Sequence, residues 1–316
     1  MKYQVAHYSV IGGRAANEDR VGCVERGRSL LMVAADGLGG HSGGEVASQT
    51  LLETVLRVYQ NVKHPHIEDP ASFLALTIMQ AHRAVSTRGR EHIPPLEART
   101  TCVLCLVQDG YAYWAHVGDS RLYHFRNGRL LTRTQDHTTI EQLHQDGLLS
   151  EEEMLTHPRR SYLMQSIGGS TPPTVALGGE TVLHPNDVLL LCTDGLWEAY
   201  TAEELGAALA KTEVDEALED LLTNTEKKMG HGCDNVSAVC LRWEDRITQS
   251  PPLLANRPTA LDTRQLYQGA AHKTARRKPA PPAPAVTETE PTERNRSIEQ
   301  RIEEIEAYLR RFEPKK

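Results

Sequence analysis

Long apolar stretches that end on an acidic residue constrain the fold of this chain more than any other feature. The run LLMVAADGLGG places Asp36 directly after an apolar strand, and LLLCTDGLWE does the same with Asp194. Asp119 follows another such run in WAHVGDSRLY, and Asp234 stands just ahead of one in GCDNVSAVCLRW. If these strands lie side by side, four carboxylates gather where the strands enter or leave their loops.

The chemistry of such a cluster indicates a metal site. Asp and Gly are also ordinary turn residues, so a turn is the simpler explanation of any single Asp-Gly pair. Four carboxylates in the same setting indicate a bound cation, because like charges held together repel one another unless a cation compensates them. Oxygen ligands without matched His or Cys favour Mg²⁺ or Mn²⁺ over Zn²⁺. The sequence therefore predicts a hard-metal site with more than one ion.

Residues 1–244 alternate between apolar runs rich in β-branched residues and amphipathic stretches, which predicts mixed strands and helices. The predicted strands are Leu30–Ala35, Thr101–Val107, Tyr111–Val117, Val188–Cys192 and Val236–Trp243. The predicted helices are Glu45–Tyr59, Ala71–Arg88, Thr139–Asp146, Ala202–Ala210 and Val214–Met229. Two helix starts carry a capping box, formed by Ser150 with Glu153 and by Thr201 with Glu204.

Charge is distributed unevenly along the chain. Residues 1–244 hold 21 Lys and Arg against 32 Asp and Glu, whereas residues 245–316 hold 14 against 10, and the whole chain has a formal net charge of −7. An acidic folded domain argues against nucleic acid as its ligand, because phosphate backbones are held by Lys and Arg. The balance fits a protein that gathers cations.

The sequence predicts a cytoplasmic protein. The N-terminus MKYQVAHYSV has no apolar stretch of the kind a secretory signal needs, and no run approaches the ~20 apolar residues of a membrane helix. Six cysteines show no disulfide-like framework. Cys102 and Cys105 form a CxxC without a second pair to complete a zinc site, and we expect them to be small core residues of a strand.

Composition changes after Trp243. Nine of the 17 prolines lie between Pro251 and Pro314, and KPAPPAPAVTETEP can form no packed core. We therefore predict a domain over residues 1–244, a Pro-rich linker over 245–291 and a short amphipathic helical tail over 292–316. The tail has one apolar stripe at 4-3-4-3 spacing, made by Ile298, Ile302, Ile305, Leu309 and Phe312. About four turns of helix are marginal alone in water, so the tail either packs on a partner or frays without function.

A basic and acidic cluster near the start, GGRAANEDR, is open to two interpretations. Arg14, Glu18 and Asp19 stand close together beside two glycines. They fit a solvated loop, and they also fit a guanidinium that grips phosphate beside a carboxylate near a metal. Arg suits phosphate because its planar fork binds two oxygens at once.

Taken in order, these segments resemble the type 2C metal-dependent serine/threonine protein phosphatases, the PPM family. The matching segments run through nearly all of residues 1–244: RAANEDR, AADGLGGHSGGEVAS, TTCVLCLV, AHVGDSRLYHFRNG, LTRTQDHT, HPRRSYLMQSIGG, LLLCTDGLWE and CDNVSAVCLRW. DGLGGH and the HPRR segment resemble the bacterial branch. The resemblance implies an α+β fold, a four-layer αββα sandwich of two antiparallel sheets flanked by helices.

The resemblance also implies a set of metal ligands. Asp36 would bridge two ions, Mn²⁺ or Mg²⁺, and the main-chain carbonyl of Gly37 would bind one of them directly or through water. Asp194 and Asp234 would complete the shell of the other ion. Asp119 resembles the ligand of a third, weaker ion.

The remaining roles concern water and substrate. By resemblance, Glu18 holds a metal-bound water, Asp19 is an indirect ligand, and Arg14 holds the substrate phosphate. Two ions ~3.5–4 Å apart would lower the pKa of a bridging water. The resulting hydroxide would attack phosphorus in line with the departing Ser or Thr oxygen, while the ions and Arg14 stabilise charge on the phosphoryl oxygens. The expected partner is a phosphoprotein, the substrate of a bacterial Ser/Thr kinase.

Two segments leave roles open. Eukaryotic relatives often have a histidine directly after the Asp-Gly pair as general acid, whereas Leu38 stands here, as in bacterial members. His41, three residues on, is interpreted as a loop histidine, and the general acid stays unassigned. Residues 138–169 correspond to a mobile flap. There His157, Arg159 and Arg160 could contact a phosphoprotein or pair with residues 151–153.

Three other hypotheses accompany the phosphatase. The same metals could serve hydrolysis of nucleotides or other small phosphate esters, or the fold could be a non-catalytic binding protein. The ligand positions retained in the sequence argue against the second. An additive hypothesis keeps the phosphatase and lets the C-terminal tail dock a partner protein.

Overall fold

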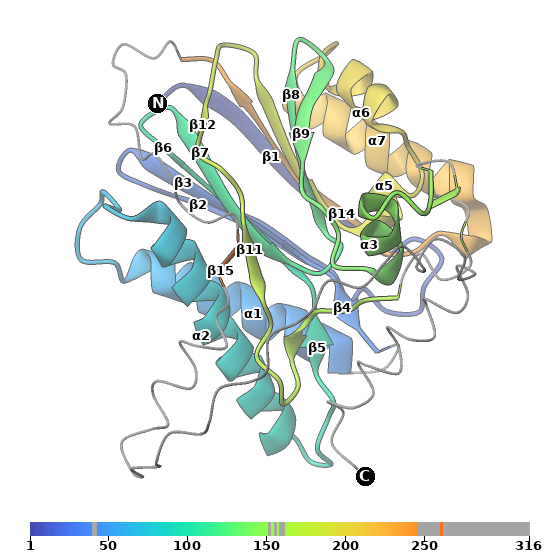
Figure 1. The fold of residues 1–316 in the computed structure, drawn as a ribbon. Coiled ribbons are helices and arrows are strands. Elements are labelled where there is room, and N and C mark those ends of the chain that lie inside the picture. Colours follow the sequence, from blue (N-terminus) through green and yellow to red (C-terminus); the bar gives the residue numbers. More distant parts are fainter. Residues whose placement is uncertain (40–42, 151–152, 155–156, 158–161, 246–259, 262–316) are drawn as a thin grey trace, which may run out of the picture.

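Two antiparallel β-sheets packed face to face form the centre of the molecule (Figure 1). The structure is a computed structural model and describes residues 1–39, 43–150, 153–154, 157, 162–245 and 260–261. The first sheet has the strand order β1 (Tyr3–Val10), β14 (Val236–Trp243), β13 (Val188–Cys192), β8 (Arg121–Arg126) and β9 (Arg129–Arg133). The second runs β15 (Ala260–Leu261), β11 (Val175–Leu177), β7 (Tyr111–Val117), β6 (Cys102–Gln108), β3 (Ser29–Ala35) and β2 (Arg20–Arg26), with β12 (Thr181–Val182) paired to β7.

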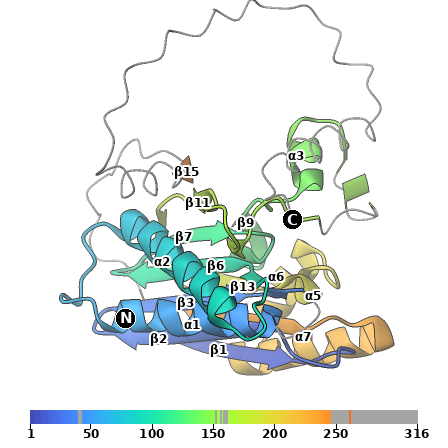
Figure 2. The ribbon, with the colours of Figure 1, turned by 90° about the horizontal axis from the view of Figure 1, so that it is seen from below.

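Helices cover the outer face of each sheet. On the second sheet lie α1 (Gly43–Gln60) and α2 (Pro70–Glu91), which Figure 2 shows running together along its strands. On the first sheet lie α6 (Ala202–Leu209) and α7 (Val214–Met229). The shorter elements are α3 (Thr139–Gln145), α5 (Asp194–Trp197), the 3₁₀ helix η1 (Gly230–Gly232), and a small sheet of β10 (Ile167–Gly168), β5 (Arg99–Thr100) and β4 (Gly37–Leu38). The result is the four-layer αββα arrangement that the resemblance implied.

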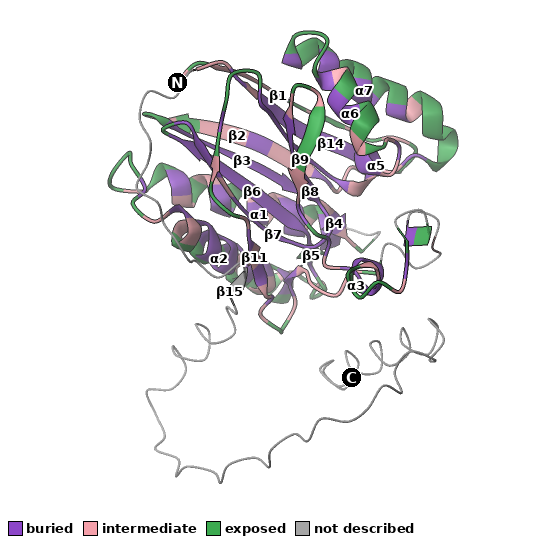
Figure 3. Ribbon diagram, turned by 45° about the horizontal axis from the view of Figure 1, so that its top comes forward, coloured by how far each residue is buried: buried purple, intermediate pink, exposed green. Residues whose placement is uncertain are grey.

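The central strands β3, β6 and β13 are apolar except at Ser29 and Gln108, because both of their faces are buried (Figure 3). Along β3, Leu31 and Val33 pack with α1 and α2, while Leu30 and Met32 face the other sheet. On β13, Leu190 belongs to the α6–α7 side and Leu189 to the interior between the sheets. Three apolar layers thus stabilise the fold, at about 25 cal/mol per Å² of apolar surface removed from water.

The predicted elements can be compared with the observed ones. All five predicted strands and all five predicted helices are present, and β7, β13, β14 and α7 have the predicted bounds. Both predicted capping boxes form, since Ser150 and Glu153, and Thr201 and Glu204, exchange side-chain bonds with each other's main-chain N–H groups. β1, β2, β8 and β9 were not predicted, because polar and charged residues break the apolar pattern there.

Cys102 and Cys105 are free and buried core residues, as predicted. They lie on opposite faces of β6, one toward the helices and one toward the other sheet. Residues three apart on a strand cannot converge on one ion, which explains why this CxxC is not a metal site.

Little of the C-terminal region is described. Ala260 and Leu261, within the segment predicted as linker, form β15 and pair with the edge of β11. The predicted tail helix over 292–316 lies outside the described residues. In the part of the chain that the structure covers, no helix has the length and apolar character needed to cross a membrane.

Candidate active site

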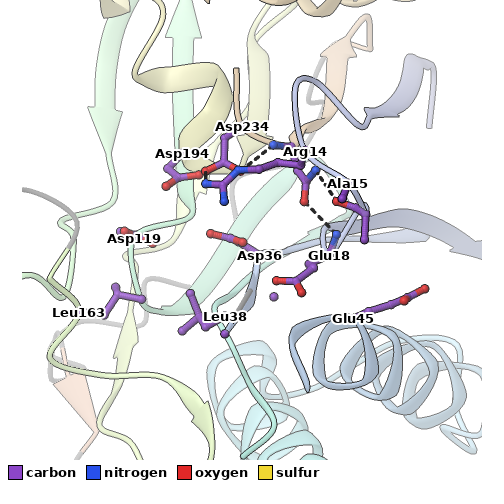
Figure 4. Close-up of a pocket in the computed structure, with 14 residues that line it drawn as sticks. Arg14, Ala15, Glu18, Asp36, Leu38, Glu45, Asp119, Leu163, Asp194 and Asp234 are labelled. Carbon is purple, nitrogen blue, oxygen red and sulfur yellow. Dashed lines mark hydrogen bonds and ion pairs between the residues drawn. The ribbon is translucent and has the colours of Figure 1, made fainter. Parts of the chain in front are cut away.

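The four predicted aspartates line a single pocket of about 630 Å³ (Figure 4). Asp36 follows β3 of one sheet, while Asp194 follows β13 and Asp234 precedes β14 of the other. Asp119 lies in the turn that joins β7 to β8. Among the described residues, those that line it are Arg14, Ala15, Ala16, Glu18, Asp36, Gly37, Leu38, Gly39, Glu45, Asp119, Leu163, Asp194, Asp234 and Asn235.

The main chain holds Asp36 at the end of its strand. Its N–H donates to Thr101 Oγ1 at 2.9 Å, and its carbonyl accepts the Thr101 N–H at 2.8 Å and the Thr100 hydroxyl at 2.7 Å. Gly37 follows, so close to α1 that a Cβ would overlap the main-chain oxygens of Gly44 and Glu18. Only glycine lets the start of α1 lie against this strand.

On the opposite sheet, Thr193 positions Asp194 and Asp19. Thr193 is the N-cap of α5, whose first residue is Asp194. The Thr193 hydroxyl donates to Asp19 Oδ2 at 2.7 Å, and the Thr193 N–H donates to the Ser237 carbonyl at 3.0 Å. Asp19 is buried and does not line the pocket, so it lies behind the wall that carries Asp194.

Arg14 is paired with a carboxylate of the cluster. Its Nη2 donates to Asp234 Oδ2 at 2.6 Å, and Asp234 Oδ1 accepts the Asn235 N–H at 2.8 Å (Figure 4). Both partners are partly exposed, with 56% and 38% of their side-chain surfaces accessible. The bond to Asp234 raises the pKa of Arg14, and Asp194 and Asp36 contribute in the same direction. The guanidinium thus acts as a counter-ion to three aspartates.

Burial and mutual repulsion make the carboxylates costly to ionise. Burial raises the pKa of Asp36 well above its usual value, and the neighbouring Asp194, Asp19 and Asp119 raise it further. The pKa of Asp194 is raised in the same way by burial and then by Asp119, Asp234 and Asp19. Burial also raises the pKa of Asp119 to about 7 and that of Asp19 to about 6.

This arrangement fits hard divalent cations. Asp119 Oδ1 is buried and has no hydrogen-bond partner within the described residues, which leaves it free to bind a cation. A cation would also offset the repulsion among Asp36, Asp119 and Asp194. Among the residues described, no three His, Cys, Asp or Glu side chains enclose an ion by themselves. Main-chain carbonyls and water would supply the other ligands, as is common for Mg²⁺.

The structure adds residues that the sequence analysis did not single out. Asn235 ties the first loop to β14, because its side-chain amide donates to the carbonyls of Ile11 and Ala16 and its oxygen accepts the Glu18 N–H. In the sequence, only its position next to Asp234 indicates that Asn235 belongs to the site. Leu163, from the predicted flap, lines the pocket. His41, Arg159 and Arg160 lie outside the described residues, and the described His157 does not line the pocket.

The comparisons with known proteins agree on one family. The profile of the protein phosphatase 2C family matches residues 8–231. The chain is 32% identical to the serine/threonine protein phosphatase PstP of Mycobacterium tuberculosis over 248 residues, which is 77% of this chain but 45% of that protein.

Two solved structures have the same fold. The serine/threonine phosphatase of S. agalactiae is similar with a TM-score of 0.70 and 27% identity, covering 77% of this chain and 100% of that one. The catalytic domain of PstP in complex with two manganese ions matches with a TM-score of 0.65 and 30% identity, covering 77% of this chain and 99% of that one.

Proposed function

The chain belongs to the protein phosphatase 2C family and is a metal-dependent serine/threonine protein phosphatase, and from this premise we propose how its own residues carry the reaction. One observation supports the assignment most directly: four aspartates from four strand ends and Arg14 line the same pocket. No simple turn requirement would bring these side chains together from both sheets.

We assign the metal ligands by their positions around the pocket. Asp36, with the carbonyl of Gly37, would bind two ions, and Asp194 and Asp234 would complete the shell of one of them. Asp119 would bind a third ion. Mn²⁺ or Mg²⁺ suits these oxygen ligands, and the relative that holds two manganese ions supports the same chemistry. When bound, the ions would supply a hydroxide nucleophile at neutral pH by lowering the pKa of a coordinated water.

Side chains of the protein itself would orient the substrate and the attacking water. Arg14 would exchange its bond with Asp234 for two bonds to oxygens of the phosphoryl group, since its planar fork matches that geometry. Glu18 lines the pocket and would orient a water molecule through its carboxylate. Asp19, bonded to Thr193 behind the wall, would fix the position of its neighbours without touching the substrate.

We propose that the substrate is a phosphoprotein modified by a cognate Ser/Thr kinase. The pocket opens to solvent at Arg14 and Asp234, whose side chains are partly exposed, as access by a phosphorylated side chain requires. We place the reaction in the cytoplasm, where thiols stay reduced, because all six cysteines are free.

The decisive experiment is hydrolysis of a phosphothreonine peptide by the full chain with Mn²⁺, with Mg²⁺ and with chelator. We expect metal-dependent phosphate release that Asp36→Asn and Asp194→Asn abolish. A nucleotide monophosphate, as comparison substrate, should be hydrolysed poorly.

The same variants supply a control for folding. In chelator, both should be at least as resistant to urea as the wild type, because each removes one of several buried like charges. If the variants are unfolded, their loss of turnover cannot be assigned to the missing carboxylate. Turnover by the wild type that persists in chelator would overturn the metal mechanism.

A further inference from the structure

Asp119 is held differently from the other carboxylates of the pocket. The residue is 3% exposed, and its Oδ1 has no hydrogen-bond partner within the described residues. Asp234, by contrast, is bonded to both Arg14 and the Asn235 N–H. The position of a buried carboxylate that bonds to nothing at one oxygen depends on the main chain that carries it, because no hydrogen bond to that oxygen holds it.

An indole fixes the main chain at Asp119. Trp197, the last residue of α5, donates from Nε1 to the Asp119 carbonyl at 3.0 Å, and this bond is buried. Trp197 lies three residues beyond Asp194 in the same short helix, so the bond links two elements that line the pocket. It holds the peptide from which the Asp119 side chain extends.

A buried ion pair holds the indole in turn. The Arg121 guanidinium lies 3.6 Å from the centroid of the Trp197 ring. It donates to both oxygens of Asp136 at 2.7–3.2 Å, and through Nη1 to the Tyr123 hydroxyl at 2.9 Å. Such a pair is expensive to bury and rarely contributes net stability compared with apolar residues, so its value lies in fixed geometry.

The residue before Asp119 is clamped as well. The Gly118 N–H donates to His137 Nδ1 at 3.3 Å, and the His137 N–H donates to the Gly118 carbonyl at 3.0 Å. Gly118 has a φ of +103° and lies so close to Thr101 that a side chain would overlap it. The turn that carries Asp119 is therefore held from both sides.

We propose that Arg121, Asp136 and Trp197 form a positioning unit that directs the Asp119 carboxylate into the pocket and so sets how tightly this carboxylate binds a cation. The inference rests on the proposed function, because it concerns the same pocket. None of these three residues is among those that line the pocket. They act through the main chain of Asp119.

Calorimetric titration of the full chain with Mn²⁺ tests the unit independently of turnover. Asp119→Asn first identifies the binding step that depends on Asp119. Trp197→Phe keeps the aromatic ring and removes the donor. Trp243→Phe is the matched control, because Trp243 is an equally buried indole whose Nε1 has no partner among the described residues. Arg121→Lys keeps the charge and removes the fork.

In Trp197→Phe, we expect the Mn²⁺ dissociation constant of the Asp119-dependent step to rise about fivefold or more. This is the size of effect expected when one buried hydrogen bond is lost. Arg121→Lys should raise it too, and Trp243→Phe should leave it unchanged although both Trp variants lower the unfolding midpoint. If Trp197→Phe binds Mn²⁺ as the wild type does, the unit is a structural support only and the inference is wrong. If the wild type itself binds no Mn²⁺, the proposed function fails instead.

Discussion

At the scale of single residues, this pocket is made of side chains that the main chain presents at fixed places. Asp36 illustrates the principle, because Thr100 and Thr101 engage both its N–H and its carbonyl and leave only the carboxylate free to respond to a ligand. Such fixed dipoles and charges cost no reorganisation when a reaction begins. Arg14 is the exception, since its partner in the structure is a carboxylate that we assign to metal binding.

We therefore predict that Arg14→Gln separates metal binding from catalysis. Loss of the fork should lower kcat/KM for a phosphothreonine peptide by about 10- to 100-fold, as expected for hydrogen bonds to a charged group. Mn²⁺ should bind about two- to fivefold more tightly, because the variant removes a partly exposed ion pair that competes for Asp234. Activity assays and calorimetric Mn²⁺ titration measure the two effects.

Arg28→Gln is the control for this prediction. Arg28, in the turn between β2 and β3, forms an exposed ion pair at 3.3 Å with another aspartate, Asp109, in the turn between β6 and β7, and the variant removes the same charge. Neither kcat/KM nor Mn²⁺ binding should change in this variant. Weaker or unchanged Mn²⁺ binding in Arg14→Gln would contradict competition at Asp234.

At the scale of elements, the sequence predicted those strands whose two faces are both apolar. β3, β6 and β13 read as continuous apolar runs because helices cover one face and a second sheet covers the other. β2 and β8 escaped prediction because Glu25 interrupts the first and His124 the second, and because an arginine stands at both ends of each strand. The aspartates were predictable because they adjoin the apolar runs, whereas Thr101 and Trp197 act on residues far away in the sequence, and no local pattern reports such contacts.

The close contact between β4 and α1 predicts how one added methyl group at Gly37 affects the stability of the fold. Gly37→Ala should lower the free energy of unfolding by about 1–3 kcal/mol, because the new Cβ would overlap main-chain oxygens of Gly44 and Glu18 that cannot move independently. Urea denaturation in chelator measures it. Gly179→Ala, whose Cβ would meet nothing within 4 Å, should be neutral. Equal stability of the two variants would show that α1 can shift.

The contact between α2 and β10 predicts a dependence of stability on pH. Burial lowers the pKa of His82 to about 4, and its Nδ1 accepts the Gly168 N–H at 3.1 Å. Between pH 6.5 and 4 the unfolded chain takes up a proton on this side chain and the folded chain does not. Stability should therefore fall as pH falls through this window, by up to about 3 kcal/mol from this group.

Urea denaturation at several pH values, compared with His82→Gln, isolates that contribution. The variant should be less stable at pH 7 but should lose less stability between pH 6.5 and 4. Parallel pH profiles for the two proteins would assign the dependence to other groups, among them the buried His116 and the half-buried His137, whose pKa values burial also lowers.

At the scale of the whole molecule, the αββα sandwich followed from the resemblance rather than from the apolar pattern alone. The pattern supplied strands and helices, but strand order depends on pairings such as β1 with β14, which join the two ends of the folded region. No local signal in the sequence specifies that pairing. Only residues 260–261 of the predicted linker are described beyond Asp245.

We predict that a chain ending at Asp245 keeps the kcat/KM of the full chain on a phosphothreonine peptide. Asp245 itself is retained because it accepts the Lys2 N–H at 2.8 Å, and the described residues that line the pocket all lie between Arg14 and Asn235. Turnover of phosphoproteins, measured beside the peptide, tests whether the tail docks a partner. A large fall with the peptide would assign the C-terminal segment to the catalytic domain.

The pocket lies where the two sheets meet, and this position bears on how long the folded state survives. Asp36 ends a strand of one sheet, whereas Asp194 and Asp234 flank strands of the other. Ions shared between them would have to leave before the sheets could separate, so occupancy should slow unfolding as well as shift its equilibrium. Metal supply would then set the lifetime of this enzyme against proteolysis, in addition to its activity.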